Sequence, residues 1–267
     1  MLMAQTINGE RISAFDAKKV DENGEKIKYF CTDCLHEVIL KQGHKNIWHF
    51  SHKSKQKNCR HNGESLYHQM MKALIKEYIE YDNDLILSEL EHSITDNKGR
   101  NYIADYYCEV LDVEGNIKKI AIECVFKHND AYNFRRKTQF YSDNDIYVLW
   151  IFDLNKFFIP EGGLKEEVRI NEIIEEARKM YIGRIYALDA YDGGFCEIFL
   201  NGIERWHDEW EDNLGYSYTL KRTKSPVYYA IDDIYLNNFY SFTAQIGMPY
   251  DRKILILRNG GDINGRI

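Results

Sequence analysis

The stretch from Asn101 to Asp153 constrains the fold most, because it follows the order strand, turn, strand, helix and strand. Residues 101–113 and 117–126 have the pattern of two strands around the hairpin turn Glu114-Gly115-Asn116. Residues 130–141 indicate a helix. Residues 146–152 (IYVLWIF) are apolar without alternation, which is typical of a strand buried on both faces. This order predicts a mixed sheet with a helical crossover.

Two carboxylates, Asp105 and Glu123, lie in the paired strands of this stretch. With a three-residue turn, Val113 pairs with Ile117. Asp105 then faces Val125 and lies diagonally across from Glu123, so both acids are within reach of one cation. A slip by one residue would place them on opposite faces. Acids at such a position need a metal or a cationic partner, although capping or salt bridges would also account for them.

The first 63 residues predict a small β-rich unit with a metal site. Residues 27–31, 37–41 and 46–50 indicate three strands, and Cys31-x-x-Cys34 forms a knuckle ahead of the last two. Zinc binds four nitrogen or sulfur ligands tetrahedrally, and a knuckle supplies two of them. A unit this small buries little apolar surface, so metal binding would supply much of its folding free energy.

The second pair of zinc ligands is expected after this hairpin, where four candidate side chains follow one another. We favour His52 and Cys59, with His49 as the main competitor and His61 also nearby. The alternative is that the cysteines occur by chance and the histidines only decorate a basic surface.

The same unit contains a local cluster of positive charge in an otherwise acidic chain. Net charge is −7, which argues mildly against coating nucleic acid through a global basic field. No acidic residue occurs between Glu37 and Glu64. The predicted phosphate-binding residues in this interval are Lys45, Lys53, Lys55, Lys57 and Arg60. A solvated loop is the alternative for these residues.

Residues 64–81 predict a helix that carries a polar stripe. Glu64, His68 and Lys72 follow each other at intervals of four and so share one helix face. From spacing alone, the stripe is either a solvent-side ladder of ion pairs or a set of groups directed at a site.

The ordered series of these motifs resembles the competence protein CoiA family. The elements that carry the resemblance are Cys31-x-x-Cys34, His49-Phe50-Ser51-His52, Cys59, Glu64-Ser65-Leu66-Tyr67-His68 with Lys72, Ala104-Asp105, Ile122-Glu123, Lys137-Thr138-x-x-Tyr141 and Val148-Leu149-Trp150-Ile151. The match extends over about residues 4–153. The resemblance implies a zinc-finger-like start and a nuclease core of the restriction-endonuclease-like PD-(D/E)xK type.

The resemblance also implies roles for individual residues. Asp105, Glu123 and the carbonyl of Cys124 would hold Mg²⁺ or Mn²⁺ for hydrolysis of DNA, with Glu64 and His68 at the same site. The position two after the second acid is Val125, where the superfamily usually has lysine. Lys127 or Lys137 would replace that lysine.

Three functional hypotheses follow. The first is a metal-dependent nuclease that acts on incoming or foreign DNA, in competence or in phage defence. The second is a catalytically inactive protein that binds DNA or a recombination protein during natural transformation. A third reading makes the zinc unit an interaction domain and the rest a structural scaffold.

The predicted organisation is an α+β or α/β chain in three parts, with boundaries at 1–63, 64–155 and 156–267. The last part predicts a helix over 164–181 followed mostly by strands, among them 216–221 and 227–234. No apolar run is long enough for a membrane span, and the start lacks the layout of a signal peptide. Six cysteines in this chain suit a reducing compartment, so the cytoplasm is expected and the oligomeric state stays open.

Overall fold

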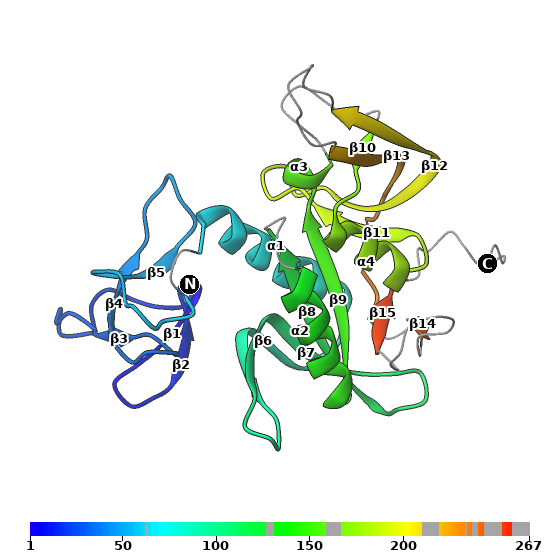
Figure 1. Cartoon of the computed structure of the whole chain (residues 1–267). Coiled ribbons are helices and arrows are strands. Elements are labelled where there is room, and N and C mark those ends of the chain that lie inside the picture. Colours follow the sequence, from blue (N-terminus) through cyan, green and yellow to red (C-terminus); the bar gives the residue numbers. More distant parts are fainter. Residues whose placement is uncertain are drawn as a thin grey trace.

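The chain folds into two β-sheets joined by a long helix, in an α+β arrangement (Figure 1). The structure is a computed structural model that describes residues 1–61, 64–126, 131–158, 167–209, 219–232, 234–236, 240–242 and 253–257. Among the helices in these ranges, none is long and apolar enough to cross a membrane.

The N-terminal sheet is small and antiparallel, as the sequence predicts. Its strands lie in the order β2 (Arg11–Ser13), β1 (Met3–Gln5), β3 (Tyr29–Phe30), β4 (Glu37–Lys41) and β5 (His49–His52). The last strand begins later than expected from 46–50, so both His49 and His52 belong to it. The hydrophobic core of this unit is small and includes Cys31 and Cys59 among its buried members.

The large sheet is mixed, which confirms the prediction for this part. Its main path runs in the order β10 (Val168–Arg169), β13 (Thr219–Ala230), β12 (Phe195–Glu209), β11 (Arg184–Leu188), β9 (Ile146–Asp153), β8 (Ile117–Val125), β7 (Asn101–Leu111) and β6 (Leu85–Thr95). Beside this path, β15 (Ile254–Ile256) pairs with β9 and with β14 (Tyr240–Phe242).

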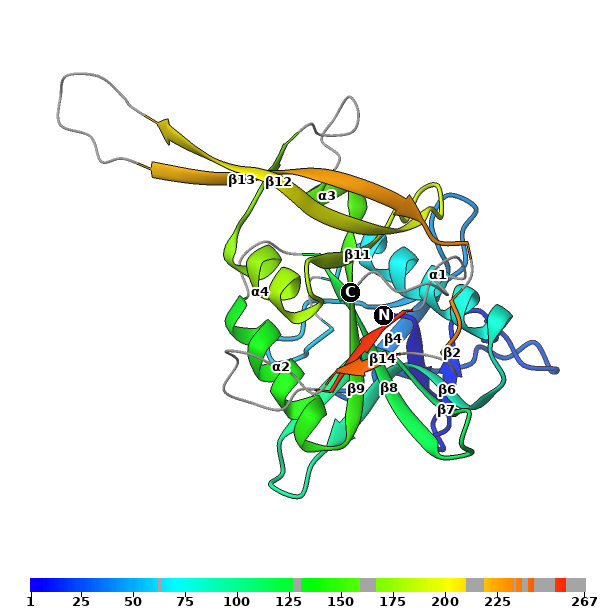
Figure 2. The same ribbon diagram turned by 90° about the vertical axis from the view of Figure 1, so that its right-hand side faces the viewer.

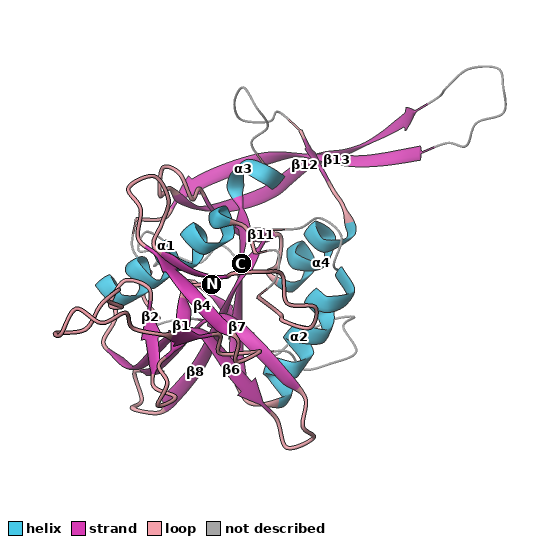
Figure 3. Ribbon diagram, turned by 90° about the vertical axis from the view of Figure 1, so that its left-hand side faces the viewer, coloured by secondary structure: helices cyan, strands magenta, loops and turns pink. Residues whose placement is uncertain are grey.

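Strand β9 lies in the middle of this sheet and pairs in parallel with both β8 and β11. Its residues are almost all buried, which explains why its sequence is apolar without alternation. Helices α2 (Ala131–Asp143) and α4 (Glu172–Met180) pack together on one flank of the sheet, and α1 (Leu66–Asp82) lies on the other (Figure 3). The short helix α3 (Leu154–Phe157) follows β9 directly.

Helix α1 starts at Leu66 because Ser65 caps it. The Ser65 side chain accepts a hydrogen bond from the backbone N–H of His68, and an N-cap serine satisfies one of the free donors of the first turn. Glu64 therefore precedes the helix, and the predicted start was early by two positions. Met71, Ile75 and Ile79 bury one face of α1 in the main core.

Within the described residues 167–181, the predicted helix over 164–181 was too long, and residues 164–166 lie outside them. Residues 168–169 form β10 and pair with β13, and α4 begins only at Glu172 because Asn171 caps it through the Ile174 N–H. The apolar residues Val168 and Ile170 fit helical spacing, but tertiary pairing with β13 draws this segment into the sheet.

Within the described residues, the two expected strands 216–221 and 227–234 are joined in β13, which runs without a break over Thr219–Ala230. Residues 216–218 and 233 lie outside the described residues. Strand β13 pairs with β12 in a long hairpin that projects from the body of the molecule (Figure 2). The large sheet also continues across residue 155, since β11 pairs with β9. The domain boundaries of the sequence analysis stay predictions.

Candidate functional site

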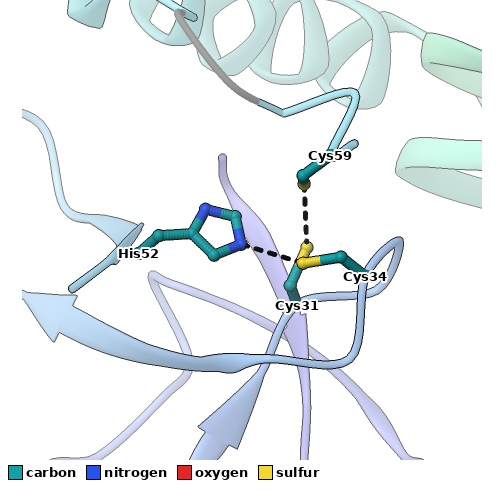
Figure 4. Close-up of side chains that lie close together, drawn as sticks. All are labelled: Cys31, Cys34, His52 and Cys59. Atoms are coloured by element: carbon teal, nitrogen blue, oxygen red, sulfur yellow. Dashed lines mark hydrogen bonds between the residues drawn. The ribbon is translucent and has the colours of Figure 1, made fainter. Parts of the chain in front are cut away.

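Four side chains of the N-terminal unit form a Cys₃His cluster. Cys31 and Cys34 lie on the turn after β3, His52 ends β5, and Cys59 comes from the loop that follows (Figure 4). Their ligand atoms all lie within 4.8 Å of one another. The Sγ atoms of Cys31 and Cys59 are 3.6 Å apart, and Cys34 Sγ is 3.2 Å from His52 Nε2. Three thiols and an imidazole at such separations fit the tetrahedral donor set of structural zinc.

The knuckle takes its shape from backbone contacts around Cys31. Its N–H donates to the His36 carbonyl, and Leu35, with a φ of 60°, donates back to the Cys31 carbonyl. A non-glycine residue with positive φ marks a tight turn. The structure thus brings the two cysteines of the C-x-x-C motif together.

His49 and His61 lie beside this cluster. His49 was the main competitor in the sequence analysis, but its Nδ1 lies 2.8 Å from the Ile47 carbonyl and outside the group of four. His61 Nδ1 lies 3.4 Å from Cys31 Sγ, whereas its Nε2 faces Glu91 Oε2 at 3.7 Å. His61 thus stands between the cluster and the second sheet.

Asp105 and Glu123 meet where β7 and β8 stop pairing. The last paired residues are Tyr106 and Ile122, so one further step in the same register places Asp105 opposite Glu123. The predicted diagonal arrangement was wrong, because the turn is longer than expected: Leu111, not Val113, pairs with Ile117. The shift is by two residues, which preserves the face on which each side chain lies.

Asp112 explains the longer turn. Its carboxylate accepts hydrogen bonds from the backbone N–H groups of Glu114 and Asn116, and its own N–H donates to the Asn116 carbonyl. Gly115 takes a φ of 84°, which favours glycine. An Asx-type turn thus closes the hairpin and sets the register of both acids.

Asp105 is held by a backbone donor and an imidazole. Cys124 N–H donates to its Oδ2 at 2.9 Å, and His68 Nε2 lies 3.2 Å from the same oxygen. Burial raises the pKa of Asp105, but the positive charge and hydrogen bond of His68 outweigh burial and hold that pKa well below its usual range. Asp105 is therefore a carboxylate.

Glu123 is held by two groups of α2. Lys137 Nζ donates to its Oε2 at 2.6 Å and to the Ile103 carbonyl at 2.7 Å, and the Tyr141 hydroxyl donates to its Oε1. Burial raises the pKa of Glu123 to about 7, with Lys137 opposing this rise and Asp105 adding to it. Two facing acids with opposite pKa shifts are typical of a functional site.

The stripe Glu64, His68 and Lys72 faces inward rather than toward solvent. His68 Nδ1 lies 3.3 Å from Glu64 Oε1, and Lys72 contacts Glu64 as well as Glu91, whose Oε1 lies 2.6 Å from Lys72 Nζ. The side chains of Lys72 and Glu91 are 2% and 1% exposed. The solvent-side ladder is thus excluded for these residues.

Glu91 was not singled out from the sequence, although it links the two sheets. Its carboxylate accepts hydrogen bonds from the backbone N–H groups of Leu2 and Met3 at 2.8 and 3.1 Å. The only sequence signal for Glu91 is that it is an acid within the strand-like residues 85–95. Tyr141 belongs to a motif of the resemblance but was given no role at the site, because nothing in its helix pattern separates it from a core aromatic residue.

The two acids and the residues that hold them lie around one cavity of about 550 Å³. Asp105, Glu123 and Lys137 line it together with His68 and Glu64. The resemblance leads one to expect a lysine at the position of Val125, but this side chain is apolar and 5% exposed at the cavity, so Lys137 is the candidate lysine found there. Lys127, the other candidate for that role, lies outside the described residues.

The predicted phosphate-binding residues are only partly gathered at this cavity. Arg60 lines it, held by Asp33 and Asn101. Lys53 pairs with Glu37 at 2.7 Å on the surface of the unit. The remaining members, Lys45, Lys55 and Lys57, are exposed.

The comparisons with known proteins agree with part of this picture. Residues 12–62 match the family model described as competence protein CoiA, N-terminal domain. This segment is CoiA-like. It contains all four residues of the Cys₃His cluster. No curated protein and no solved structure matches the chain, so the nuclease-type core stays a proposal.

Proposed function

We propose that this protein is a metal-dependent DNA nuclease that acts on incoming or foreign DNA in natural competence or in phage defence. The observation that carries the proposal is that Asp105 and Glu123 meet at one cavity with Lys137 beside them. The similarity of residues 12–62 to a competence protein domain supports the biological setting. A restriction-endonuclease-like core is part of this proposal.

The residues at the cavity fit a hard divalent cation. Asp105, Glu123 and the carbonyl of Cys124 give an all-oxygen donor set of the kind that Mg²⁺ and Mn²⁺ take. When bound, such an ion neutralises a phosphodiester and activates water for attack on it. The low pKa of Asp105 keeps one donor charged at neutral pH.

The chain's own residues would then position and neutralise the substrate. The Lys137 ammonium, which lies beside Glu123, would also neutralise the phosphate. It would thus take the role of the strand lysine whose position Val125 occupies. His68 would fix the orientation of Asp105, and Glu64 would fix His68 through its contact with Nδ1. These two act on the carboxylate rather than on the substrate.

The Cys₃His cluster would hold Zn²⁺ in a structural role. Four protein ligands leave no open position, and a closed site stabilises the fold rather than performing chemistry. The cluster would fix the loop that carries Arg60 at the cavity.

Nuclease activity is tested with purified full-length protein, single- and double-stranded DNA, and Mg²⁺ or Mn²⁺. We expect cleavage that Asp105→Asn and Glu123→Gln abolish while both variants keep the far-UV circular dichroism of the parent. His44→Ala, a change at an exposed side chain, serves as the control and should cleave normally. Absence of cleavage by the parent with either metal would refute the proposal.

A second candidate, a catalytically inactive DNA- or recombinase-binding protein, is favoured by one observation. Both carboxylate oxygens of Glu123 are already engaged, one by Lys137 and one by Tyr141. For this candidate, DNA binding should survive Glu123→Gln but fail when Lys53, Lys55 and Lys57 are changed to glutamine. The scaffold reading predicts neither cleavage nor salt-dependent DNA affinity.

A further inference from the structure

Three aromatic rings lead from the candidate site toward the surface. The Phe126 ring stacks on His68 with centroids 6.1 Å apart and also lines the cavity. Tyr67 lies 5.8 Å from Phe126, and Tyr191 lies 4.8 Å from Tyr67. We call Phe126, Tyr67 and Tyr191 the ring shelf. Because Phe126 touches both the cavity and Tyr67, the shelf is continuous with the site.

A cation accompanies the rings. Lys156 Nζ lies 4.1 Å from the centroid of the Phe126 ring, and the Lys156 side chain is exposed. Its backbone is fixed at the start of α3, where its N–H donates to Asp153 Oδ1 at 3.0 Å. Proteins bind single-stranded nucleic acid with aromatic rings and positive charges side by side. The bases stack on the rings, and the phosphates pair with the charges.

The shelf is held in place before any ligand binds. The Tyr67 hydroxyl accepts hydrogen bonds from Asn155 Nδ2 and from the backbone N–H of Ala190, both at 3.2 Å. Tyr191 follows on a turn in which Asp189 Oδ1 accepts its N–H at 2.8 Å. Tyr191 nevertheless leaves 72% of its surface exposed. A fixed and exposed ring can receive a base without a large ordering cost.

The turn that carries Tyr191 is closed by a glycine. Gly193 has a φ of 76°, and its N–H donates to the Asp189 carbonyl at 2.8 Å. The Gly193 carbonyl accepts a hydrogen bond from the Tyr78 hydroxyl. Helix α1 thus contacts the turn through Tyr78 and helps to hold it in place. The exposed ring of Tyr191 has a rigid base.

The depth of the candidate site gives an independent argument about the substrate. The side chains of Asp105 and Glu123 are 16% and 3% exposed, so a phosphate must enter the cavity to reach both. A duplex keeps its bases paired and bends little over a few base pairs. A single strand can unstack locally and lower one phosphate into the cavity while its neighbouring bases contact rings.

We propose that the ring shelf binds the bases of single-stranded DNA beside the scissile phosphate, so that single strands are the preferred substrate. This inference rests on the proposed nuclease function. Tyr191 supplies the outer stacking surface, and Lys156 pairs with a backbone phosphate. Duplex DNA reaches the same site only at ends or unpaired segments.

The test measures binding rather than cleavage. Fluorescence anisotropy gives the Kd of the full chain for a labelled single strand and for the duplex of the same sequence, with Ca²⁺ in place of Mg²⁺. We expect the single strand to bind at least tenfold more tightly. Tyr191→Ala should weaken single-strand binding about fivefold to tenfold, within the range for one stacked base, and should leave duplex binding unchanged.

Two variants control for nonspecific effects. Tyr191→Phe keeps the ring and should bind as the parent does. Tyr81→Ala removes a tyrosine that is 87% exposed near the other end of α1, and it should also bind as the parent does. The inference is overturned if duplex and single strand bind equally well, or if Tyr191→Ala weakens neither.

Cleavage measured on the same variants separates this inference from the proposed function. If no metal supports cleavage but Tyr191→Ala still weakens single-strand binding selectively, the shelf is supported and the nuclease fails. If the parent cleaves duplex and single strand at equal rates, and Tyr191→Ala cleaves as the parent does, the nuclease is supported and the shelf fails.

Discussion

Lys137 is the residue on which the proposed chemistry depends most. It reaches Glu123 from α2, whereas the nuclease core that the resemblance implies would have its lysine on the strand, where this chain has Val125. The sequence named Lys137 only as one of two candidates, because sequence spacing does not fix which side chains of a helix meet the strand that precedes it. Packing of α2 against β9 brings the amine to the carboxylate.

Lys137→Gln should lower the rate of DNA cleavage about 100-fold, the order of magnitude for loss of one group that stabilises developing charge. Lys137→Arg should keep part of the rate, because it retains the charge. Single-turnover cleavage of a labelled oligonucleotide measures both. Arg136→Gln, an exposed neighbour on α2, provides the matched control and should have little effect. Equal rates for Lys137→Gln and the parent would exclude Lys137 from the chemistry.

Glu91 is a second residue with a testable role. It is buried between Lys72 and the backbone of β1. The change to glutamine would leave the buried Lys72 with Glu64 as its acidic neighbour and would turn an amide NH₂ toward one of the groups that now donate to Glu91. Glu91→Gln should lower the free energy of unfolding by about 3 kcal/mol, as for other broken buried pairs. Urea denaturation at pH 7 measures this decrease, and Glu89→Gln, at a more exposed acid of the same strand, should cost much less.

The same residue predicts a pH dependence. Burial raises the pKa of Glu91, but Lys72 more than offsets this, so the folded pKa lies below the usual 4.5. The stabilising contribution is therefore complete above about pH 4.5 and is lost as pH falls further. Between pH 5 and pH 3 the parent should lose more stability than Glu91→Gln. Parallel decreases in the two proteins would contradict this assignment.

At the scale of elements, the proposed zinc at the Cys₃His cluster would stabilise the N-terminal sheet. Its strands are short and its core is small, so a metal cross-link between the knuckle, β5 and the following loop would hold much of it together. The C-x-x-C spacing predicted the knuckle, because two ligands of one tight turn are local in sequence. The sequence favoured His52 over His49 as the third ligand. Both lie on β5, and the structure places His52 rather than His49 in the group of four.

Replacement of a cluster ligand should release the metal and unfold this sheet. We expect about one zinc per chain by elemental analysis of the parent and almost none for Cys34→Ser or His52→Ala. His49→Ala and His44→Ala should retain it, because neither side chain belongs to the group of four. Limited proteolysis should then cut the metal-free variants within residues 1–61 first. Retention of zinc by His52→Ala would point to His61 as the ligand.

The β7–β8 hairpin shows how an element sets a site. Its sequence predicted two strands and a shared face for the acids, but it placed Asp105 opposite Val125 rather than Glu123. The Asp112 turn adds two residues to the loop, and hydrogen bonds within the turn are not visible in the alternation of the strands.

At the scale of the whole molecule, an acidic chain would have to bind DNA through a local surface. The net charge is −7, while Lys53, Lys55 and Lys57 form a local run of exposed cations. Changing all three to glutamine should weaken DNA binding. It should also reduce the slope of log affinity against log salt by about 0.7 to 0.9 for each phosphate that the variant no longer neutralises. Titrations at several salt concentrations measure this, and an unchanged slope would remove these lysines from the interface.

The sequence by itself determined the elements and groupings that are local along the chain. These are the knuckle, the apolar strand β9, the helix with its Glu64–His68–Lys72 face, and the placement of Asp105 and Glu123 on the same face of the β7–β8 hairpin. Each follows from a periodicity or a spacing of a few residues.

Only the tertiary structure decided which distant groups meet. It paired Lys137 and Tyr141 with Glu123, joined Lys72 to Glu91, and drew residues 168–169 into the sheet rather than a helix. These contacts depend on how helices pack on strands and how loops close. Such packing is a property of the whole chain, so no local pattern encodes it.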